Sequence, residues 1–444
     1  MAIRRRNERG AVLVHVAVAI IALLAVSALA VDAGAKWVAR GQAQNAADAG
    51  ALAGAIALAF DDPNDLTDNG LAKQSARSYA QANLVLGQPP DVDVTTDVTF
   101  PPCPDGSPDT CVKVTVYRNQ ARGNALPTFF ARAVGITEQG VVATATAQVR
   151  IGTATECLRP WAIVDRWDEV DGPEPDYPGT DPDFVPNTST FDRYPSPWNR
   201  TPEPDLYVPP TADSPGTGWT IADHGQQFTI KTCGGQDVSS GWYRQIDLPR
   251  TDGNNQGGQA YGENIVSCNG YPVAIADPAT QCPSGSAIST LEEKIYWAAR
   301  GCVRVQTGCD QGNTRAGIVE LYGRDPGARW VPSLNGGRGG IGGSVSTPSP
   351  RIVPIAVMDI DLFLAADPQG STDSAKLVNI FGFFIEGMGR LDQDGNLQFD
   401  PNDPLRQNAD IVVGRLVTLA GLDLAGGPSI DPNSAFLRTI LLVR

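Results

Sequence analysis

The stretch RRRNERGAVLVHVAVAIIALLAVSALAVDAG, residues 4–34, decides how this chain is organised. Within it, residues 11–31 form 21 residues without a formal charge, and a helix of that length spans roughly the 30 Å hydrocarbon core of a bilayer. Arginines precede this segment, and the positive-inside rule keeps such residues in the cytoplasm. The sequence therefore predicts a single-pass membrane protein with residues 1–10 as a cytoplasmic basic tail and an extracytoplasmic body after Asp32.

A cleaved signal peptide is the alternative to a retained membrane helix. Ala28, Leu29 and Ala30 have the small-x-small form that signal peptidase accepts after a basic region and an apolar run. Both alternatives export the body of the chain. Helix-forming sequence continues from residue 31 to residue 59 without a turn or a proline, which favours retention.

The composition indicates an acidic, loop-rich body. At 444 residues, the chain is long enough for an anchor followed by two or three folded units. Its 47 glycines and 35 prolines are many for a helical protein and favour strands and loops. The formal net charge is -15 although the first ten residues are basic, so the body lacks the clustered Lys and Arg that hold a phosphate backbone. A nucleic-acid partner is therefore not expected.

The cysteines indicate disulfide bonds. No Cys-x-x-Cys motif occurs, and neither His15 nor His224 sits beside a cysteine pair at zinc-ligand spacing, so disulfides are favoured over metal or free thiols in an exported body. One pairing is predicted, because Cys103 and Cys111 flank a turn at residues 104–108, and the other pairings stay open. The eight candidates are Cys103, Cys111, Cys157, Cys233, Cys268, Cys282, Cys302 and Cys309.

Small residues recur beyond the membrane segment. Ala46, Gly50 and Gly54 follow one another every four residues on one helix face, beside an apolar stripe that includes Ile56. Such residues let another backbone approach closely. The partner is either the protein's own sheet, which we slightly favour, or a neighbouring subunit.

The N-terminal sequence resembles a known family. The segments RGAVLV (9–14), AVDAG (30–34) and QAQNAADAGALAGA (42–55) resemble the N-terminal part of the TadG-like proteins of Flp (Tad) pilus assembly. The segments LPTFFARAVGI (126–136) and ATATAQV (143–149) extend the resemblance to about residue 150. The resemblance implies a pilin-like component of a bacterial cell membrane that takes part in assembling adhesive pili. Its expected partners are the membrane and other Tad pilus-assembly proteins or pilin subunits.

Two departures limit this resemblance. Many large TadG proteins carry a von Willebrand A domain with an Asp-x-Ser-x-Ser metal motif, and this motif does not occur in the present sequence. Type IV pilins and TadE-like pseudopilins have Glu at the fifth position after a processing glycine, whereas Gly10 is followed at that spacing by His15. A neutral imidazole cannot replace that carboxylate, so prepilin-type cleavage after Gly10 is not expected.

Hydrophobic periodicity predicts an α+β fold in which a long N-terminal helix lies on a small antiparallel sheet, followed by a large β-rich, disulfide-containing exported region. The pilin-like domain covers residues 32–152. Residues 61–65 break the long helix. The elements expected after this break are a helix over 71–86, hairpin strands over 92–100 and 112–117, a helix near Phe129 and a strand over 141–151.

The exported region divides into four parts: a Pro/Asp-rich linker or loop region at 153–218, a Cys-rich domain at 219–334, a Gly/Ser/Pro linker at 335–350 and a β-rich region at 351–444. In the Cys-rich domain, a capping box of Ser289 and Glu292 precedes a predicted helix over 294–300, which Gly301 ends. Strands are expected at 227–231, 273–275, 317–322, 352–358, 377–385, 411–419 and 436–443. The last four form a sandwich or half-barrel, or join the preceding strands in one sheet.

One loop has the spacing of a calcium site. Oxygen side chains occupy positions 1, 3, 5, 9 and 12 of the segment 392–403, and hard oxygen ligands at this spacing suit calcium. However, the glycine falls at position 4 instead of 6, and position 12 is not the bidentate Glu of an EF-hand. A solvated acidic turn is therefore favoured over a calcium site. The candidate ligands are Asp392, Asp394, Asn396, Asp400 and Asp403.

The sequence shows no catalytic set. A nucleophile with a histidine base would have to be built around His224, and no Gly-x-Ser-x-Gly accompanies it. We therefore predict a non-enzymatic, membrane-anchored component of pilus assembly or surface adhesion, without a cofactor other than the calcium just considered. The alternative is an exported ligand-binding module or enzyme that uses the TadG-like segment as a tether.

Overall fold

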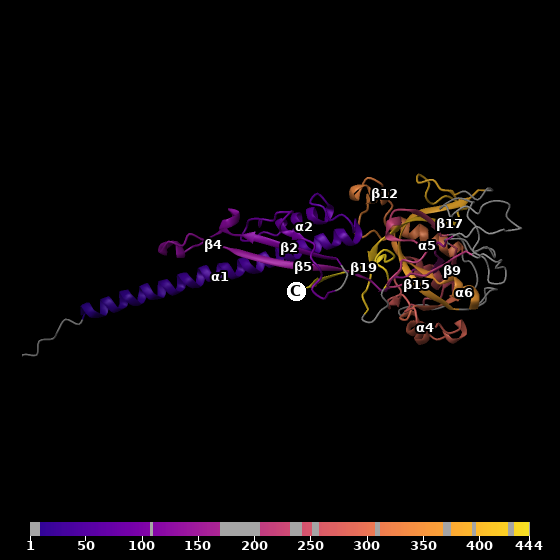
Figure 1. Ribbon diagram of the computed structural model, residues 1–444, viewed down its shortest axis with the longest axis horizontal. Coiled ribbons are helices and arrows are strands. Elements are labelled where there is room, and N and C mark those ends of the chain that lie inside the picture. Colours follow the sequence, from indigo (N-terminus) through magenta and orange to yellow (C-terminus); the bar gives the residue numbers. More distant parts are fainter. Residues whose placement is uncertain are drawn as a thin grey trace, which may run out of the picture. The chain divides into compact units, whose positions relative to one another are not determined.

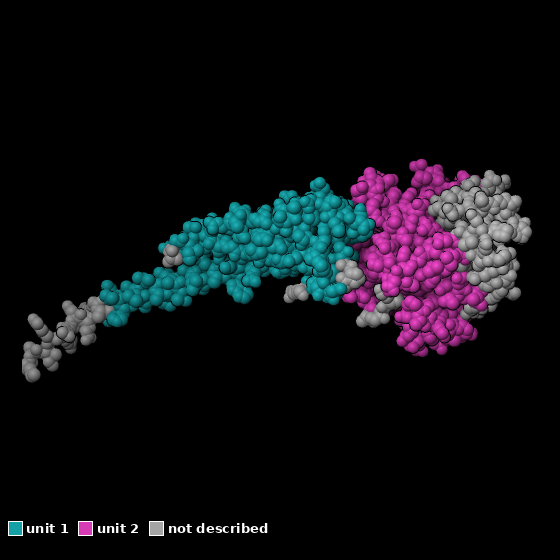
Figure 2. Space-filling model, viewed as in Figure 1, with its two compact units in different colours: residues 1–58, 62–149, 440–444 teal, residues 59–61, 150–439 magenta. Residues whose placement is uncertain are grey.

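The structure is a computed structural model. It describes residues 9–106, 110–168, 205–230, 242–250, 257–306, 311–366, 374–392, 397–424 and 430–443. The described chain forms two compact units, coloured separately in Figure 2. Unit 1 comprises residues 1–58, 62–149 and 440–444, and unit 2 comprises residues 59–61 and 150–439. The mixed α+β fold expected from the sequence is confirmed.

The longest element is helix α1 (Arg9–Phe60), whose 52 residues form one uninterrupted helix (Figure 1). It contains no proline and is rich in alanine, the residue with the highest helix propensity. It ends directly before Asp61, Asp62 and Pro63, where proline favours extended backbone for the residue before it. The helix therefore runs continuously from the apolar segment into the folded part of unit 1.

The main sheet of unit 1 is covered by helices on one face. Strands β2 (Thr110–Arg118) and β5 (Val141–Ile151) pair antiparallel, and short β1 (Val98–Thr99) pairs with β2. Val112, Val114 and Val116 of β2 are fully buried, and the residues between them are more exposed, as expected for a sheet with one covered face. Helices α1 and α2 (Leu71–Ala82) pack on that face. Residues 440–443, the end of β19 (Leu437–Val443), also belong to this unit.

A small hairpin in unit 1 joins β2 to β5. It contains β3 (Leu126–Pro127), the short 3-10 helix η2 (Ala131–Val134) and β4 (Glu138–Gln139), and a second 3-10 turn, η1 (Gln120–Arg122), precedes it. Strands β3 and β4 pair antiparallel. The helix predicted near Phe129 is thus a single 3-10 turn.

Unit 2 is built on one eight-stranded sheet in the order β11-β9-β7-β14-β15-β17-β8, with β16 paired to β15. All pairings are antiparallel except that of β7 with β14. Strand β11 pairs with both β9 and the beginning of β15, which closes five strands into a ring. The bounds are β7 (Trp161–Val164), β8 (Gln227–Ile230), β9 (Tyr243–Ile246), β11 (Cys302–Gln306), β14 (Ile352–Met358), β15 (Ser374–Leu391), β16 (Leu397–Gln398) and β17 (Ile411–Val417).

Helices and small ladders complete unit 2. They are α3 (Gly257–Val266), α4 (Leu291–Ala298), α5 (Gln311–Arg324), α6 (Ile360–Ala366), η3 (Ile221–Asp223), η4 (Gly285–Ala287), η5 (Asn335–Gly337), β6 (Ala154–Thr155) with β10 (Val273–Ala274), β12 (Arg329–Val331) with β13 (Gly340–Gly342), and β18 (Leu419–Ala420) with β19. The core is rich in aromatic residues; the rings of Phe381 and Phe436, for example, lie 4.6 Å apart. Such ring pairs add to the free energy gained by burial of apolar area.

Several predictions of local structure are wrong. Residues 317–322 lie in helix α5 and not in a strand. Gly317 lets α5 approach α3, because a Cβ there would lie 2.6 Å from Cγ2 of Ile265. The predicted linker at 335–350 instead contains η5 and β13. The predicted linker or loop region at 153–218 contributes β7, an interior strand of the eight-stranded sheet. Of the strand predicted at 92–100, only β1 forms, because residues 93–97 make a turn closed by side-chain hydrogen bonds.

The regions 219–334 and 351–444 were predicted separately, with a shared sheet as the alternative for the last four strands. The observed sheet takes β8, β9 and β11 from the first region and β14, β15 and β17 from the second. They therefore form one structural unit, and the alternative of one joint sheet is the observed arrangement for these strands. The last predicted strand is β19 instead, which lies outside this sheet.

Candidate functional site

The N-terminal half of α1 is an exposed apolar rod. Its large apolar side chains from Val12 to Val31 are between 48% and 74% exposed. Among the residues that the structure describes, α1 is the one helix long and apolar enough to cross a membrane. His15, the residue at the expected glutamate position, lies within this exposed segment. This half of α1 can therefore be covered by lipid.

The C-terminal half of α1 is packed inside its own unit. A Cβ on Gly50 would lie 2.9 Å from both the carbonyl oxygen of Ala76 and the Cβ of Ala80 in α2. A Cβ on Gly54 would lie 2.8 Å from Cγ1 of Val112 in β2. The small residues thus allow α1 to contact α2 and the sheet, which is the favoured of the two interpretations given above.

We expect a larger side chain at this contact to destabilise unit 1. Gly50→Leu forces the backbone of α2 away from α1 and should lower the free energy of unfolding by about 1–3 kcal/mol, as overpacking does elsewhere. Gly41→Leu in the same helix is the matched control, because nothing lies within 4 Å of a Cβ there. Urea unfolding of the full chain in detergent measures both variants. Equal stability of the two variants would contradict this account of the helix contact.

Asp32 connects α1 to the hairpin between β2 and β5. Its carboxylate accepts hydrogen bonds from the backbone N–H groups of Phe129 (2.7 Å), Phe130 (3.0 Å) and Ala131 (2.6 Å). Burial raises the pKa of this carboxyl, but the three N–H donors lower it more, so the pKa of Asp32 lies below its ordinary value. Asp32, the first acidic residue after the apolar segment, thus holds residues 129–131 against α1.

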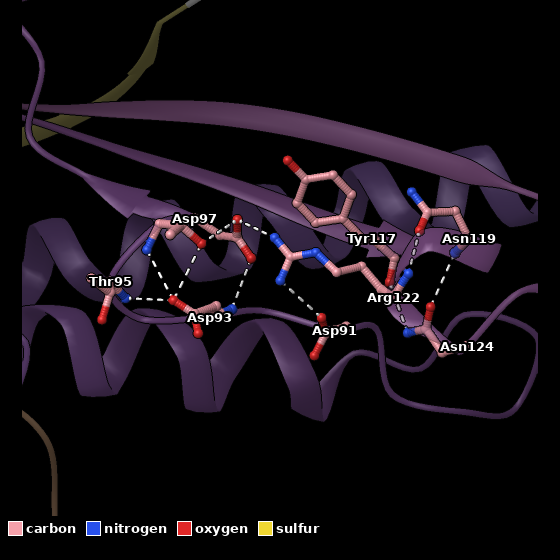
Figure 3. Close-up of polar contacts among 9 residues, drawn as sticks. Asp91, Asp93, Thr95, Asp97, Tyr117, Asn119, Arg122 and Asn124 are labelled. Atoms are coloured by element: carbon pink, nitrogen blue, oxygen red, sulfur yellow. Dashed lines mark hydrogen bonds and ion pairs between the residues drawn. The ribbon is translucent and has the colours of Figure 1, made fainter.

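A second polar cluster in unit 1 is shown in Figure 3. The guanidinium of Arg122 lies 2.8 Å from Oδ1 of Asp97 and 3.2 Å from Oδ2 of Asp91, and its Cζ lies 4.6 Å from the ring centre of Tyr117. Asp93 accepts hydrogen bonds from backbone N–H groups of its own turn, and these lower its pKa.

Burial lowers the pKa of Arg122, but Asp97 and Asp91 raise it more, so this guanidinium stays charged. Asp91 and Asp97 accept hydrogen bonds from the guanidinium of Arg122, and Asp97 also accepts one from the backbone N–H of Asp93 (Figure 3). The cluster therefore fixes the 91–97 loop to the end of β2. Its role is structural.

The candidate calcium ligands are only partly placed. Asp394 and Asn396 lie outside the described residues. Asp392 accepts a hydrogen bond of 3.0 Å from Nε2 of Gln398, and Oδ1 of Asp400 accepts one of 2.8 Å from the backbone N–H of Asn402. Asp403 is exposed in the following turn. In the described parts of the chain, no group of three or more His, Cys, Asp or Glu could hold a metal ion. Calcium binding by this loop stays a prediction.

Three disulfides are present among the described cysteines. Cys103 pairs with Cys111 across a Cα separation of 5.3 Å, which confirms the predicted pairing. Cys157 pairs with Cys268, and Cys282 pairs with Cys302 on either side of helix α4. Cys233 and Cys309 lie outside the described residues. Disulfides of this kind are typical of an exported protein.

The capping box of α4 is shifted by one residue from the prediction. Thr290 is the N-cap and Glu293 the reciprocal partner, whereas the sequence suggested Ser289 and Glu292. Both pairs have the required spacing, so the sequence pattern alone did not choose between them. The hydrogen bonds that Glu293 accepts from Thr290 and Ser289 lower its pKa to about 2.

Two buried ionisable residues in unit 2 were not singled out from the sequence. Asp165 is 1% exposed, and its Oδ1 accepts hydrogen bonds from the backbone N–H groups of Trp219 (2.9 Å) and Arg166 (2.8 Å). Arg351 is 1% exposed and donates to four backbone carbonyls, those of Asp325, Ala328, Ile385 and Glu386. No local sequence signal marks either residue, because all of these partners except Arg166 are distant in the chain.

Comparisons with known proteins bear on the N-terminal helix. The model of one family, described as "Putative Flp pilus-assembly TadE/G-like", matches residues 10–57, which cover nearly all of α1. Neither the curated proteins nor the solved structures give a match to this chain. The matched segment includes both the exposed apolar half and the packed half of the helix. The chain therefore carries a TadE/G-like domain of the Flp pilus-assembly family at its N-terminus.

Proposed function

We propose that this chain is a non-enzymatic, pilin-like component of Flp/Tad pilus assembly or surface adhesion. Helix α1 anchors it in the bacterial membrane, and its body lies outside the cytoplasm. One observation carries the proposal: the residues that match the pilus-assembly family lie in α1, and the two halves of this helix have different surroundings. One half is apolar and exposed, and the other half packs against its own α2 and β2. A long helix on an antiparallel sheet is the general plan of pilins.

Charge and cysteine chemistry support the proposed orientation. The arginines before the apolar segment favour a cytoplasmic N-terminus, and the three disulfides need an oxidising compartment. The proposed partners are pilin subunits or other pilus-assembly proteins that meet the exposed half of α1 within the membrane. Such contacts need close packing, because lipid chains are as apolar as the helix and association gains little from the hydrophobic effect.

The test changes the side chains of the membrane segment and keeps its length and apolar character. In a strain lacking this chain, we expect the full-length protein to restore surface pili. A variant whose residues 11–31 are replaced by 21 leucines should stay in the membrane but fail to restore pili, because its side chains no longer fit partner helices. Pili counted by electron microscopy and membrane retention measured by fractionation give the two readouts. Equal restoration by both proteins would show that α1 is only a tether.

A further inference from the structure

An exposed group of apolar side chains lies at the tip of the hairpin in unit 1. We define the aromatic hairpin as residues 126–139, from β3 to β4. Phe129, Phe130 and Ile136 at its tip are 59%, 52% and 54% exposed. Two adjacent phenylalanines and an isoleucine exposed on one short hairpin indicate a surface that meets an apolar environment.

The aromatic hairpin is ordered by its own hydrogen bonds. The backbone N–H of Thr128 donates to the carbonyl of Thr137 (3.2 Å), and the N–H of Ile136 donates to the carbonyl of Ala131 (3.0 Å). Gly135 makes the reversal with a φ of 86°, in the left-handed region that glycine adopts without strain. Leu126 at its base is fully buried. The apolar tip is therefore presented on a defined turn.

The position of the hairpin along α1 is fixed by Asp32. Three consecutive backbone N–H groups, including those of both phenylalanines, lie within 3.0 Å of its carboxylate. Asp32 directly follows the apolar segment 11–31, and helix side chains lean toward the N-terminus, here toward that segment. Figure 1 shows the hairpin beside α1, at the end of the sheet from which the N-terminal half of the helix extends. The tip thus lies where the apolar segment ends.

Other residues at this level have the chemistry of a membrane interface. Trp37 is 78% exposed and lies about 7.5 Å further along α1 than Asp32, given the helical rise. Tryptophan is enriched where hydrocarbon meets headgroups. Lys36, Arg40 and Arg132 are exposed cations, with Glu138 as the exposed acid of the hairpin. Cations near aromatic residues suit the phosphates and acyl boundary of a lipid surface.

We infer that the aromatic hairpin is a second membrane contact, in which Phe129, Phe130 and Ile136 enter the interfacial layer of the bilayer that α1 crosses. This inference rests on the membrane anchoring within the proposed function. The occupant is lipid because the backbone of the tip is hydrogen-bonded to Asp32, the residue that directly follows the apolar segment. Asp32 is a positioning residue that holds the hairpin at this depth. The contact would fix the tilt and rotation of unit 1 above the membrane, which a single helix alone leaves free.

The test is photo-crosslinking of the full chain in vesicles of phosphatidylcholine and phosphatidylglycerol. Benzoylphenylalanine is placed at Phe130, at Leu23 within the apolar segment as the anchor reference, and at Tyr79 on α2 as a matched exposed aromatic control. Tyr79 is 60% exposed in the same unit. Mass spectrometry measures the fraction of each protein that carries a lipid adduct. We expect adducts at Leu23 and Phe130 and none at Tyr79.

Two variants test the geometry. With the crosslinker at Ile136, F129A/F130A should reduce the lipid adduct about tenfold, the change expected from removing buried aromatic area. With the crosslinker at Phe130, Asp32→Ala should reduce the adduct at Phe130 while a parallel protein with the crosslinker at Leu23 keeps its own. This second result separates positioning of the hairpin from loss of the anchor.

The results distinguish failure of the hairpin contact from failure of the membrane anchor. Adducts at Leu23 without adducts at Phe130 would overturn the hairpin contact and leave the anchor intact. Crosslinks from Phe130 to a second copy of the chain, in place of lipid, would also overturn it. Absence of adducts at Leu23 would overturn both the anchor and the contact that rests on it.

Discussion

Replacing Arg351 by alanine should lower the free energy of unfolding of unit 2 by about 3–5 kcal/mol, the combined cost of a core cavity and of buried carbonyls left without donors. The side chain is 1% exposed, and its Nη1 donates to the carbonyls of Asp325 (3.0 Å) and Ala328 (2.8 Å). Its Nε and Nη2 both donate to Ile385, at 2.9 and 2.7 Å. Alanine would leave these buried carbonyls without their donors and create a cavity.

The surroundings of Arg351 explain why a planar cation is used. Its Cζ lies 4.1 Å from the ring centre of Tyr322 and 5.0 Å from that of Phe384. Burial lowers its pKa, while Tyr322 and Asp325 raise it, so the net direction is downward. A lysine has no planar fork and cannot reach both sets of carbonyls, so Arg351→Lys should fall between wild type and Arg351→Ala.

Urea unfolding of the full chain in detergent, followed by tryptophan fluorescence, measures this effect. Buried Trp161 and Trp219 of unit 2 provide the signal. Arg390→Ala is the matched control on β15, because Arg390 is exposed and surface substitutions usually stay within about 0.5 kcal/mol. A loss below about 1 kcal/mol for Arg351→Ala would contradict the role given to its hydrogen bonds.

The second large effect is a pH dependence produced by Asp165. Burial raises the pKa of Asp165 to about 7, and the N–H donors of Trp219 and Arg166 only partly offset this. In the unfolded chain the carboxyl titrates near 3.8. Between these values the folded state binds the extra proton, so stability falls as pH rises. The contribution is complete below pH 3.8 and is lost as the pH passes about 7, with a total of about 4 kcal/mol.

Asp165→Asn should remove most of this slope and make the protein more stable than wild type at pH 8. The amide oxygen of asparagine can accept both hydrogen bonds that Oδ1 of Asp165 accepts, and the amide carries no charge to desolvate. A smaller slope should remain, because burial also raises the pKa of Asp359.

Urea unfolding at a series of pH values from 4 to 8 measures the slope. The exposed Asp168, three residues further along the chain, gives the control Asp168→Asn. If Asp165→Asn keeps the wild-type slope, another group is responsible.

The elements predicted correctly have local causes. Helix α1 follows from a long proline-free, alanine-rich run, and its end follows from the Asp-Asp-Pro sequence at 61–63. The Cys103–Cys111 pairing follows from a short turn that brings the two cysteines together. Helix α4 follows from a capping box, although two possible boxes one residue apart left its N-cap undecided from the sequence. Such features depend on neighbours within a few residues.

The errors have tertiary causes. Helix α5 contains Gly312, Gly317 and Gly323 and the β-branched pair Ile318-Val319, which disfavour a helix locally. Its packing against Ile265 of α3 outweighs that propensity. Likewise, the glycine-rich stretch at 335–350 looked like a linker, yet β13 pairs there with β12. Its partner β12 lies only a few residues earlier in the chain, and the turn between the two strands shows little apolar pattern from which the pairing could be predicted.

The sequence by itself determined the apolar helix, its basic flank, the resemblance to the TadE/G-like family and the α+β class, because these depend on composition and short-range periodicity. Only the tertiary structure decided that Gly50 and Gly54 face α2 and the sheet. It also showed that Asp32 holds Phe129 and Phe130, and that Arg351 joins carbonyls from separate segments. These contacts join residues far apart in the chain. A single Asp or Arg produces no periodic pattern in the sequence, so its partners become known only from the folded structure.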